Sequence, residues 1–355
     1  MIRQEETEIL LKKYSKALNK FWRGEKKFIK SFIEESGKKF IYYKKPLENM
    51  FSIFGNYKKL IKRVKTELDS KEISLNLKKG NSFILTPGNI PLLEIEYLYF
   101  LILVSKRILW RPSRNYLKIS RRLLNYLKRE GLKNLKITTK NLENLKEEIY
   151  NFDNYILIGS SNTLEEFKKV IDPNKKIIEY GSKTSLSIMM NLNGLERLIK
   201  DITYFSHSGC LSPTIIFVHE KIFDQFITKL REKLKEFDSL FSKKEKLFNF
   251  YLNLSYFSET EKVGEFYLRV NQEKIIISKG ILNIFKFRGI EEVLKKITPF
   301  ETMIQGISIY PLEKEYVGML KERFKHFYIK EAGNLQLIDE DFFPDGIKPL
   351  KILLN

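Results

Sequence analysis

Short apolar runs alternate with helical segments between residues 82 and 181, and this alternation is the feature that most restricts the fold of the chain. The apolar runs, most of them ended by a Gly- or Pro-containing turn, are residues 82–86, 107–110, 135–139, 155–158 and 176–178. Helical spacing occupies residues 91–106 and 116–130 between the first three runs. Strands that are joined through helices pack in parallel, so we predict an α/β fold with a doubly wound sheet.

The pattern starts again in the second half of the chain, with a strand-like run, a helix and two further apolar runs at residues 214–218, 221–237, 274–277 and 307–310. A chain of 355 residues is too long for one ordinary core. We expect a helical N-terminal region at 1–70, a first α/β domain at 71–185 and a second one at 186–334. A C-terminal segment from about residue 335 to residue 355 can return to the first α/β domain.

The charge of the chain is strongly positive. It has 64 Lys and Arg against 44 Asp and Glu, a net charge of +20 that is spread along the whole length. Lys- and Glu-rich surfaces are typical of thermophiles, and a positive excess also suits polyanions or anionic ligands such as coenzyme A and NADP. No basic segment with interleaved aromatic residues has the form of a nucleic-acid-binding motif, so we expect no nucleic-acid partner.

The sequence predicts a cytoplasmic protein without a membrane span. Three of its first six residues are charged, and the apolar segment of a secretory signal does not follow them. The most apolar stretch, residues 97–104, contains Glu94 and Glu96 when it is extended back to Pro91. It is therefore shorter than the roughly 20 apolar residues of a membrane helix, and we interpret it as a buried helix.

Cys210 is the only cysteine of the chain. One thiol forms neither an internal disulfide nor a cysteine-rich metal site, so we expect no metal. The remaining interpretations are a small buried apolar residue, an inert side chain or a nucleophile, and buried cysteines are common. Gly209 precedes Cys210 and a strand-like run follows it, which is compatible with a nucleophile in a turn.

Polar turns at the ends of predicted strands are the other candidate sites, because ligands of parallel sheets bind at the carboxyl ends of strands. Each turn also has a simpler interpretation. Asn89 is typical of a turn residue that tolerates left-handed backbone angles. Gly159-Ser160-Ser161 lacks the spaced glycines of a dinucleotide-binding fingerprint. Glu179 by itself fits a solvated carboxylate.

The order of the motifs is more informative than any one of them. They are Pro87-Gly88-Asn89-Ile90-Pro91, Leu109-Trp110-Arg111-Pro112-Ser113, Gly159-Ser160-Ser161, Glu179-Tyr180-Gly181-Ser182-Lys183, Ser208-Gly209-Cys210, Pro299-Phe300-Glu301, Ile304-Gln305-Gly306-Ile307 and Phe343-Pro344-Asp345-Gly346. In this order they resemble the aldehyde dehydrogenase superfamily, most closely its acyl-CoA reductase branch, the LuxC-type fatty acid reductases. The first motif resembles the family's Pro-Trp-Asn-x-Pro with Gly in place of Trp, and the one at 299–301 matches only loosely.

The resemblance implies an aldehyde-dehydrogenase-like fold, in which residues 71–185 form a Rossmann-type cofactor domain and residues 186–334 the catalytic domain. It implies that Cys210 accepts the acyl group and that the Asn89 amide stabilises the oxyanion. The residues that it assigns to the nicotinamide cofactor are Arg111, Ser113, Gly159, Ser160, Gly181 and Glu301. A guanidinium at position 111 suits a 2′-phosphate, so NADPH is the preferred donor and NADH the alternative.

The function that follows is reduction of a long-chain acyl-CoA or acyl-carrier thioester to an aldehyde, with an acyl-carrier or acyl-transferase protein as partner and a homo-oligomer as the family expectation. Two alternatives stay open: an aldehyde dehydrogenase in the oxidising direction, and a non-catalytic binding protein. Glu179 has three interpretations, namely a carboxylate that points away, a proton donor and acceptor, or a base for hydrolysis. His207 is either an aid to thiol ionisation or a structural residue.

Overall fold

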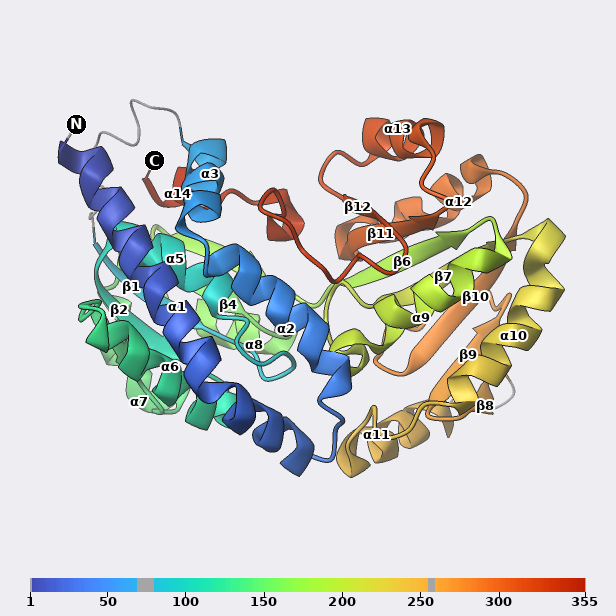
Figure 1. Cartoon of the computed structure of the whole chain (residues 1–355), viewed down its shortest axis with the longest axis horizontal. Helices are drawn as coiled ribbons and strands as arrows, with labels where there is room; N and C mark the ends of the chain where they lie inside the picture. Colours follow the sequence, from blue (N-terminus) through green and yellow to red (C-terminus); the bar gives the residue numbers. More distant parts are fainter. Residues whose placement is uncertain (1, 69–79, 255–258, 355) are drawn as a thin grey trace. The chain divides into compact units, whose positions relative to one another are not determined.

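The computed structural model of the chain describes residues 2–68, 80–254 and 259–354 (Figure 1). The chain divides into two units, each built from segments that are distant in sequence. Unit 1 contains Met1–Ile29, Glu48–Ser182 and Asp339–Asn355, and unit 2 contains Lys30–Leu47 and Lys183–Ile338. The boundary that we expected between residues 70 and 71 lies outside the described residues.

Unit 1 is built around a five-stranded sheet in which every neighbouring pair is parallel. The strands are β1 (Gly80–Leu85), β2 (Ser105–Arg111), β3 (Leu135–Ile137), β4 (Asn154–Ile158) and β5 (Lys176–Tyr180). The sheet order is β3-β2-β1-β4-β5, so the direction of winding reverses between β1 and β4. This confirms the predicted doubly wound sheet, and it places the ligand crevice typical of such folds at the carboxyl ends of β1 and β4.

The helices of unit 1 follow the predicted alternation. They are α5 (Ile95–Val104), α6 (Leu117–Arg129), α7 (Leu142–Tyr150) and α8 (Ser161–Lys168). Helix α5 is buried along its whole length except at Glu96, which explains why its sequence is continuously apolar rather than amphipathic. No helix of the described residues has the length and apolarity that crossing a bilayer requires.

Three helices come from the N-terminal region, as the sequence predicts: α1 (Ile2–Glu35), α2 (Ile41–Phe54) and α3 (Tyr57–Glu67). Helix α1 buries a stripe at helical spacing, which consists of Leu11, Tyr14, Leu18 and Phe21. The Tyr14 hydroxyl donates to the Ile95 carbonyl at 2.8 Å, so α1 is fixed to the start of α5. The last helix, α14 (Pro349–Leu354), also lies in unit 1.

Unit 2 has a seven-stranded sheet in the order β12-β11-β6-β7-β10-β9-β8. The strands are β6 (Thr184–Met189), β7 (Pro213–His219), β8 (Glu261–Val263), β9 (Phe266–Val270), β10 (Ile281–Phe287), β11 (Ile304–Tyr310) and β12 (Tyr328–Glu331). All neighbours are parallel except β8 and β9.

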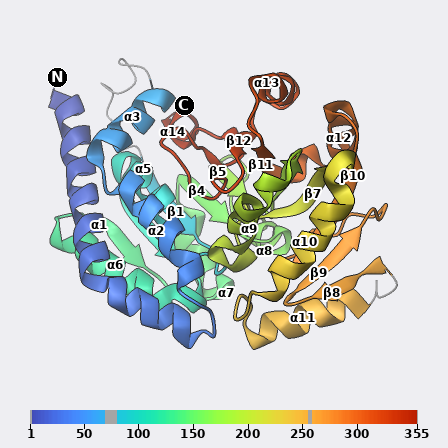
Figure 2. The ribbon, with the colours of Figure 1, turned by 45° about the vertical axis from the view of Figure 1, so that its right-hand side comes forward.

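Helices cover both faces of this sheet. They are α9 (Leu195–Thr203), α10 (Phe223–Lys235), α11 (Lys243–Leu254), α12 (Ile290–Ile297) and α13 (Lys314–Arg323). Strand β7 shows how one strand supplies two cores, because Ile216 and Val218 pack with α9 and α10 while Ile215 and Phe217 pack with α12. Helix α11 lies beside the β8–β9 end of the sheet in two views (Figures 1 and 2).

One apolar run does not form a strand as expected. Residues 274–277 are irregular, and the strand of this region is β10 instead. The reason is the side chain of Asn283, which accepts a hydrogen bond from Ile276 N at 3.0 Å and donates to the Ile276 carbonyl at 2.8 Å. The run is therefore held by one amide side chain rather than by a strand ladder.

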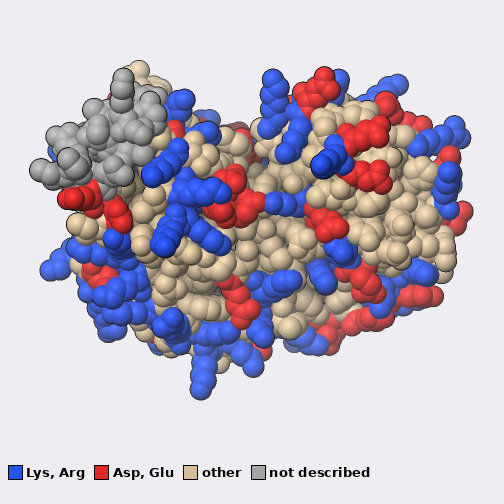
Figure 3. Space-filling view, turned by 45° about the horizontal axis from the view of Figure 1, so that its top comes forward, with Lys and Arg blue, Asp and Glu red and all other residues tan. Residues whose placement is uncertain are grey.

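The positive charge is distributed as the sequence suggests. On the face shown in Figure 3, Lys and Arg side chains occur across the whole view, with Asp and Glu side chains among them. Many of these groups form surface ion pairs, which contribute little to stability individually.

Candidate active site

Cys210 follows a turn with an unusual backbone. The 3₁₀ segment Tyr204–His207 connects α9 to the loop before β7, and Phe205, Ser206 and His207 have φ values of 51°, 52° and 54°. Left-handed backbone costs roughly 1–2 kcal/mol for each residue that has a Cβ, so three in succession need strong support from their surroundings. Strain of this kind concentrates at functional sites.

His207 provides part of that support. Its Nδ1 accepts a hydrogen bond from Gly280 N at 2.8 Å, which means that Nε2 carries the proton and donates to the Pro213 carbonyl at 3.0 Å. Burial lowers the pKa of His207 to about 4, so the ring is neutral near pH 7. Both ring nitrogens are used by the backbone, and this identifies His207 as a structural residue rather than an aid to thiol ionisation.

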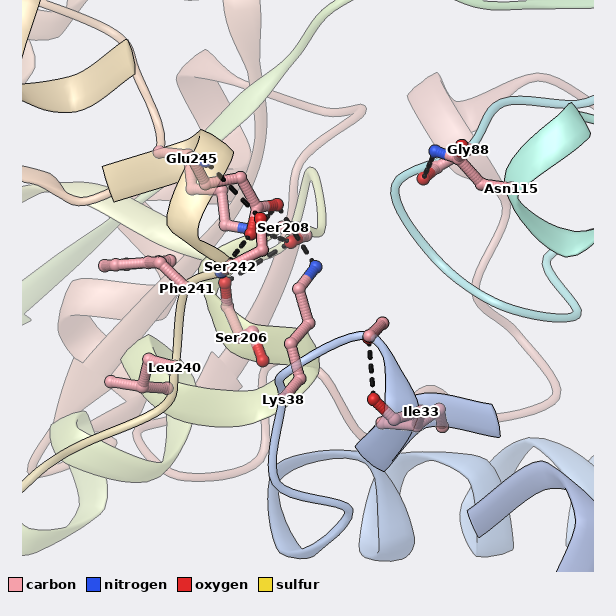
Figure 4. A network of polar contacts seen from close by, with 12 residues as sticks. Ile33, Lys38, Gly88, Asn115, Ser206, Ser208, Leu240, Phe241, Ser242 and Glu245 are labelled. Carbon is pink, nitrogen blue, oxygen red and sulfur yellow. Dashed lines mark hydrogen bonds and ion pairs between the residues drawn. The ribbon is translucent and has the colours of Figure 1, made fainter. Parts of the chain in front are cut away.

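A charged network supports the same turn from another direction. Lys279 Nζ donates to the Ser208 hydroxyl and pairs with Glu245 Oε1 at 2.6 Å, while Lys38 Nζ lies 3.1 Å from the same carboxylate oxygen. Figure 4 shows Lys38, Ser208 and Glu245 converging on this contact from three separate segments.

Burial has different consequences for the two partners of the Lys279–Glu245 pair. For Lys279, burial and then the charge of Lys38 outweigh the attraction of Glu245 and lower its pKa to about 8. For Glu245, burial acts to raise the pKa, but the charges of Lys279 and Lys38 outweigh it and lower the pKa to about 2. The carboxylate is therefore ionised near pH 7. No sequence motif marks Lys279, Glu245 or Lys38, which are common charged residue types.

Cys210 itself is half-exposed and forms no disulfide. Its carbonyl accepts a hydrogen bond from the Ser185 hydroxyl of β6 at 2.9 Å. The next residue, Leu211, packs against Gly306 of β11, where a Cβ would lie 3.1 Å from Leu211 Cδ2 and 2.9 Å from the Tyr328 carbonyl. Gly306 belongs to one of the motifs that the sequence singled out, and its lack of a side chain lets the cysteine loop approach the sheet.

In unit 1, the turn after β1 is joined to the turn after β2. A Cβ on Gly88 would lie only 2.3 Å from Ser113 Oγ and 2.9 Å from Asn115 Nδ2, and Asn115 Nδ2 donates to the Gly88 carbonyl at 3.3 Å. A side chain at position 88 would collide with Ser113 and Asn115, which explains why this chain has glycine there and not the tryptophan of the family that it resembles. Asn89, the next residue, is exposed at the carboxyl end of β1.

Arg111 and Ser113 lie at the carboxyl end of β2. Arg111 Nε donates to the Lys140 carbonyl at 2.9 Å, and the guanidinium lies 5.6 Å from the centre of the Phe167 ring. Burial, with a smaller effect from Arg114, lowers the pKa of Arg111 from its usual value. Ser113 caps the short 3₁₀ segment Arg114–Tyr116 by accepting from Asn115 N.

The turn after β4 leads directly into α8. Ser160 is the N-cap of this helix, because its hydroxyl accepts from Thr163 N. Gly159 N donates to the Tyr180 carbonyl at 3.1 Å, which fixes the turn to the end of β5. A Cβ on Gly159 or Gly181 would meet nothing closer than 3.5 Å, so packing does not require glycine at either position.

Glu179 lies within β5 and its neighbours Ile178 and Tyr180 are buried. Its carboxylate pairs with Lys168 at the end of α8, at 3.0 Å. Glu301 lies in unit 2, in the 3₁₀ segment Thr298–Met303, and is half-exposed. The described residues contain no group of three His, Cys, Asp or Glu side chains that could hold a metal ion.

The predicted site residues therefore divide between the units. Cys210 and Glu301 belong to unit 2, and the seven residues of unit 1 are Asn89, Arg111, Ser113, Gly159, Ser160, Glu179 and Gly181. Within unit 1, the structure brings together the Gly88-Asn89 turn and the Ser113 turn, and it places Ser160 beside the end of β5. The individual roles of these residues remain predictions.

Comparison with known proteins shows both a family and a fold. The family model described as acyl-CoA reductase (LuxC) matches residues 51–248, more than half of the chain. A comparison with curated protein sequences finds no match.

Among solved structures, the chain is similar to a succinic semialdehyde dehydrogenase from Streptococcus pyogenes in complex with NADP+, with a TM-score of 0.74 and 14% identity over 92% of this chain and 81% of that one. It is similar to the substrate-bound AldH of Staphylococcus aureus, with a TM-score of 0.68 and 17% identity over 95% and 82%. It is also similar to a salicylaldehyde dehydrogenase from Pseudomonas putida G7, with a TM-score of 0.71 and 11% identity over 92% and 77%. These similarities confirm the expected aldehyde-dehydrogenase-like fold.

Proposed function

The chain belongs to the acyl-CoA reductase (LuxC) family, oxidoreductases that act on aldehyde or acyl groups, and on this basis we propose that it reduces an acyl thioester to an aldehyde through an acyl group bound to Cys210. The observation that carries the proposal is the loop of Cys210. Three left-handed residues precede the thiol, and His207 and Lys279 hold them from two directions. An inert cysteine does not require such a loop.

In the proposed reaction, the Cys210 thiolate attacks the thioester carbonyl and the bond between the acyl carbon and the carrier sulfur breaks. The carrier leaves as a thiol after it takes up a proton. Reduction of the cysteine-bound acyl group gives a thiohemiacetal, which releases the aldehyde and restores the Cys210 thiolate. We propose coenzyme A or an acyl-carrier protein as the carrier and a long acyl chain as the substrate.

Asn89 is proposed to stabilise the oxyanion together with the backbone N–H of Cys210. Its exposed position at the carboxyl end of β1, where the winding of the sheet reverses, supports this role. Loss of one donor to an oxyanion typically costs about 3–4 kcal/mol in the barrier, or a factor of about 10² to 10³ in rate.

A reduced nicotinamide, proposed as NADPH, supplies the hydride when it is bound. The residues of unit 1 fit such a group in two respects. Ser160 begins α8 at the carboxyl end of β4, which suits a pyrophosphate. Arg111 Nε bonds to a carbonyl and its Nη atoms have no hydrogen-bond partner among the described residues, which suits a 2′-phosphate. Ser113, Gly159, Gly181 and Glu301 complete the proposed cofactor residues.

Glu179 determines whether hydrolysis competes with reduction. A base that activated water beside the acyl-cysteine would hydrolyse the acyl-enzyme before a reductase could reduce it. The ion pair with Lys168 supports the proposal that the carboxylate is held away from such a role. The other interpretation is that Glu179 acts as a proton donor and acceptor for the thiol. The variant Glu179→Gln distinguishes the two. Reduction should be slower if the carboxylate transfers protons, and unchanged if it is held away from the reaction.

The test uses purified protein, NADPH and a series of acyl-CoAs of increasing chain length. We expect NADPH oxidation and aldehyde formation in equal amounts, and transfer of a labelled acyl group to the protein when NADPH is left out. Cys210→Ala should abolish both, and Ser208→Ala, which removes the acceptor of the Lys279 hydrogen bond, should slow acyl transfer without abolishing it. Absence of label on the wild-type protein with every acyl-CoA contradicts the mechanism.

The oxidising direction is the second candidate, and the presence of Glu179 favours it. It predicts reduction of NADP+ by an aldehyde without added coenzyme A, and loss of that activity in Glu179→Gln. Measurement of both directions on one preparation distinguishes the candidates.

A further inference from the structure

Helix α11 has its polar side chains inside and its apolar side chains outside. Five large apolar residues are between 47% and 61% exposed, namely Leu247, Phe248, Phe250, Tyr251 and Leu254. The residues that it buries are Asn249 and Asn253, which are 2% and 3% exposed. This is the reverse of an ordinary surface helix, which turns its apolar stripe toward the core.

The exposed residues form one stripe. Positions 247, 250, 251 and 254 follow the spacing of three and four residues that places side chains on one face of a helix, and position 248 widens that face. Phe250 and Tyr251 contact each other edge to face, with ring centres 5.7 Å apart. A contiguous apolar surface of this kind on a folded protein usually marks a place where something else binds.

The inward face shows that this orientation is specified by the fold. Glu245 of α11 accepts the hydrogen bonds and ion pairs from Lys279 and Lys38. Asn249 lies against Gly280, where a Cβ would be 2.4 Å from Asn249 Nδ2. Turning the apolar stripe inward would expose these contacts and break the support of the cysteine loop. The outward stripe is therefore fixed by the same network that holds Ser208.

The charge of the stripe indicates what covers it. Lys243 and Lys244 are exposed in the first turn of α11, at helical positions that continue the apolar stripe, and neither has an ion-pair partner among the described residues. Glu245, the only carboxylate of the helix, faces inward. Lys246, the third exposed lysine of the helix, pairs with Glu265. The outward-facing residues of α11 thus combine aromatic and aliphatic side chains with lysines and no acid, on a chain of net charge +20.

We propose that α11 docks this protein on an anionic membrane surface. Aromatic and Leu side chains that are flanked by lysines suit the boundary between headgroups and acyl chains, where the apolar groups insert and the lysines stay at the level of the phosphates. A second copy of this chain is disfavoured, because it would bring two lysine-bearing stripes and two strongly positive molecules together. The helix lies on the bilayer and does not span it. The proposal is independent of the proposed function.

The consequence concerns the cysteine loop. Lys279 bonds both to Glu245 of α11 and to Ser208, so the docking helix and the loop of Cys210 belong to one hydrogen-bonded network of unit 2. Figure 4 labels two of its members, Ser208 and Glu245. Docking would hold a protein that acts on acyl chains or releases aliphatic products at the membrane, where such molecules accumulate.

The test is co-sedimentation of the full-length protein with vesicles of phosphatidylcholine alone or of equal parts phosphatidylcholine and phosphatidylglycerol. We expect binding to the anionic vesicles. The double variant Phe248→Ser/Tyr251→Ser should bind about a hundredfold more weakly, because two large apolar side chains no longer insert. Lys243→Gln/Lys244→Gln should bind about tenfold more weakly, and added salt should abolish the difference between this variant and the wild type.

The matched control is Tyr150→Ser, because Tyr150 is an equally exposed aromatic residue at the end of a different helix. It should bind like the wild type. Circular dichroism and thermal unfolding of each variant establish that the exposed substitutions leave the fold intact. Failure of the wild type to bind anionic vesicles overturns the proposal, as does equal binding by Phe248→Ser/Tyr251→Ser. A wild-type dimer that this double variant converts to a monomer, without vesicle binding, assigns the stripe to a second copy and also overturns it.

Discussion

At the scale of single residues, the backbone before Cys210 is held in a left-handed conformation by groups from distant segments. Gly280 N and Lys279 Nζ, both in the turn before β10, bond to His207 and Ser208. Two neighbouring residues of one turn therefore act on two neighbouring residues of another. We infer that Lys279 is a positioning residue for the cysteine loop.

The first prediction concerns Lys279. Lys279→Met removes the donor to the Ser208 hydroxyl, and we expect kcat for acyl-CoA reduction to fall about tenfold while KM stays within a factor of about two, a loss that corresponds to about 1.4 kcal/mol for a charge-assisted hydrogen bond. Lys279→Arg should restore most of the activity because it keeps a charged donor. Lys246→Met, which removes an exposed lysine of α11 that pairs with Glu265, is the matched control. An equal loss in the Arg and Met variants would argue against positioning.

The second prediction concerns His207 and pH. The folded protein lowers the pKa of His207 from 6.5 to about 4, so the unfolded chain binds more protons between these two values. The stability that the neutral ring contributes is complete above pH 6.5 and is lost as the pH falls toward 4, and the shift corresponds to about 3 kcal/mol. Urea unfolding at several pH values measures this effect. In His207→Gln, which cannot titrate, the difference in unfolding free energy from wild type should become smaller as the pH falls from 6.5 to 4.5.

At the scale of elements, the sequence predicted all five strands of unit 1 but only β7 and β11 of unit 2, and β6 shows the reason. Strand β6 has the sequence Thr-Ser-Leu-Ser-Ile-Met, and all six residues are buried. Its polar side chains are satisfied by partners far along the chain: the Ser187 hydroxyl bonds to Ser308, and the Thr184 hydroxyl bonds to Thr214 at 2.7 Å. The alternation of Ser185-Leu186-Ser187-Ile188 is typical of a strand with one exposed face, so the sequence does not show that both faces of β6 are buried.

The candidate site follows the same rule. Cys210, Asn89 and Arg111 were found because they stand in motifs close in sequence. Lys279, Glu245 and Ser185 support the cysteine loop through contacts with residues more than 20 positions away, and no local pattern marks them. Glycines were informative only where a neighbour excludes a side chain, as at Gly88 and Gly306.

Helix α3 gives the third prediction, because Arg63 ties it to other segments of unit 1. The guanidinium donates to Tyr99 of α5 and to the carbonyls of Asp339 and Glu340. Arg63 is 2% exposed. Arg63→Met leaves these acceptors without their donor, and removal of one partner from a buried charged network typically costs about 3–5 kcal/mol.

The loss in Arg63→Met should depend on pH. Burial raises the pKa values of Glu67 and Glu96 to about 7, and the charge of Arg63 acts against that rise. A raised pKa in the folded state contributes stability that is complete below about pH 4.5 and is lost as the pH rises through about 7. Without Arg63 the two pKa values rise further, so the variant should be more destabilised relative to wild type at pH 8 than at pH 6. Urea unfolding at both pH values checks this, and an equal loss at both contradicts it.

At the scale of the whole molecule, each unit is completed by a segment from elsewhere in the chain. Residues 30–47 belong to unit 2, where Tyr43 contacts Phe205 of the cysteine loop with ring centres 5.9 Å apart. Residues 339–355 return to unit 1, where Leu350 N donates to Glu67 Oε2 at 2.7 Å. Units with separate cores are expected to unfold in separate steps, and each returning segment should stabilise its own unit.

Deletion of residues 339–355 tests this organisation and is the fourth prediction. It removes the buried side chains of Leu350 and Leu353. It also removes the carbonyl that accepts from Arg63 and the backbone N–H that donates to Glu67. Each lost Leu side chain alone is worth about 1.5–3 kcal/mol of burial. In differential scanning calorimetry we expect the transition of unit 1 to move to a lower temperature while that of unit 2 stays in place. Ile352→Ser, a change at an exposed position of the same helix, should leave both transitions unchanged. A shift of both transitions by the deletion would show that the two cores unfold as one.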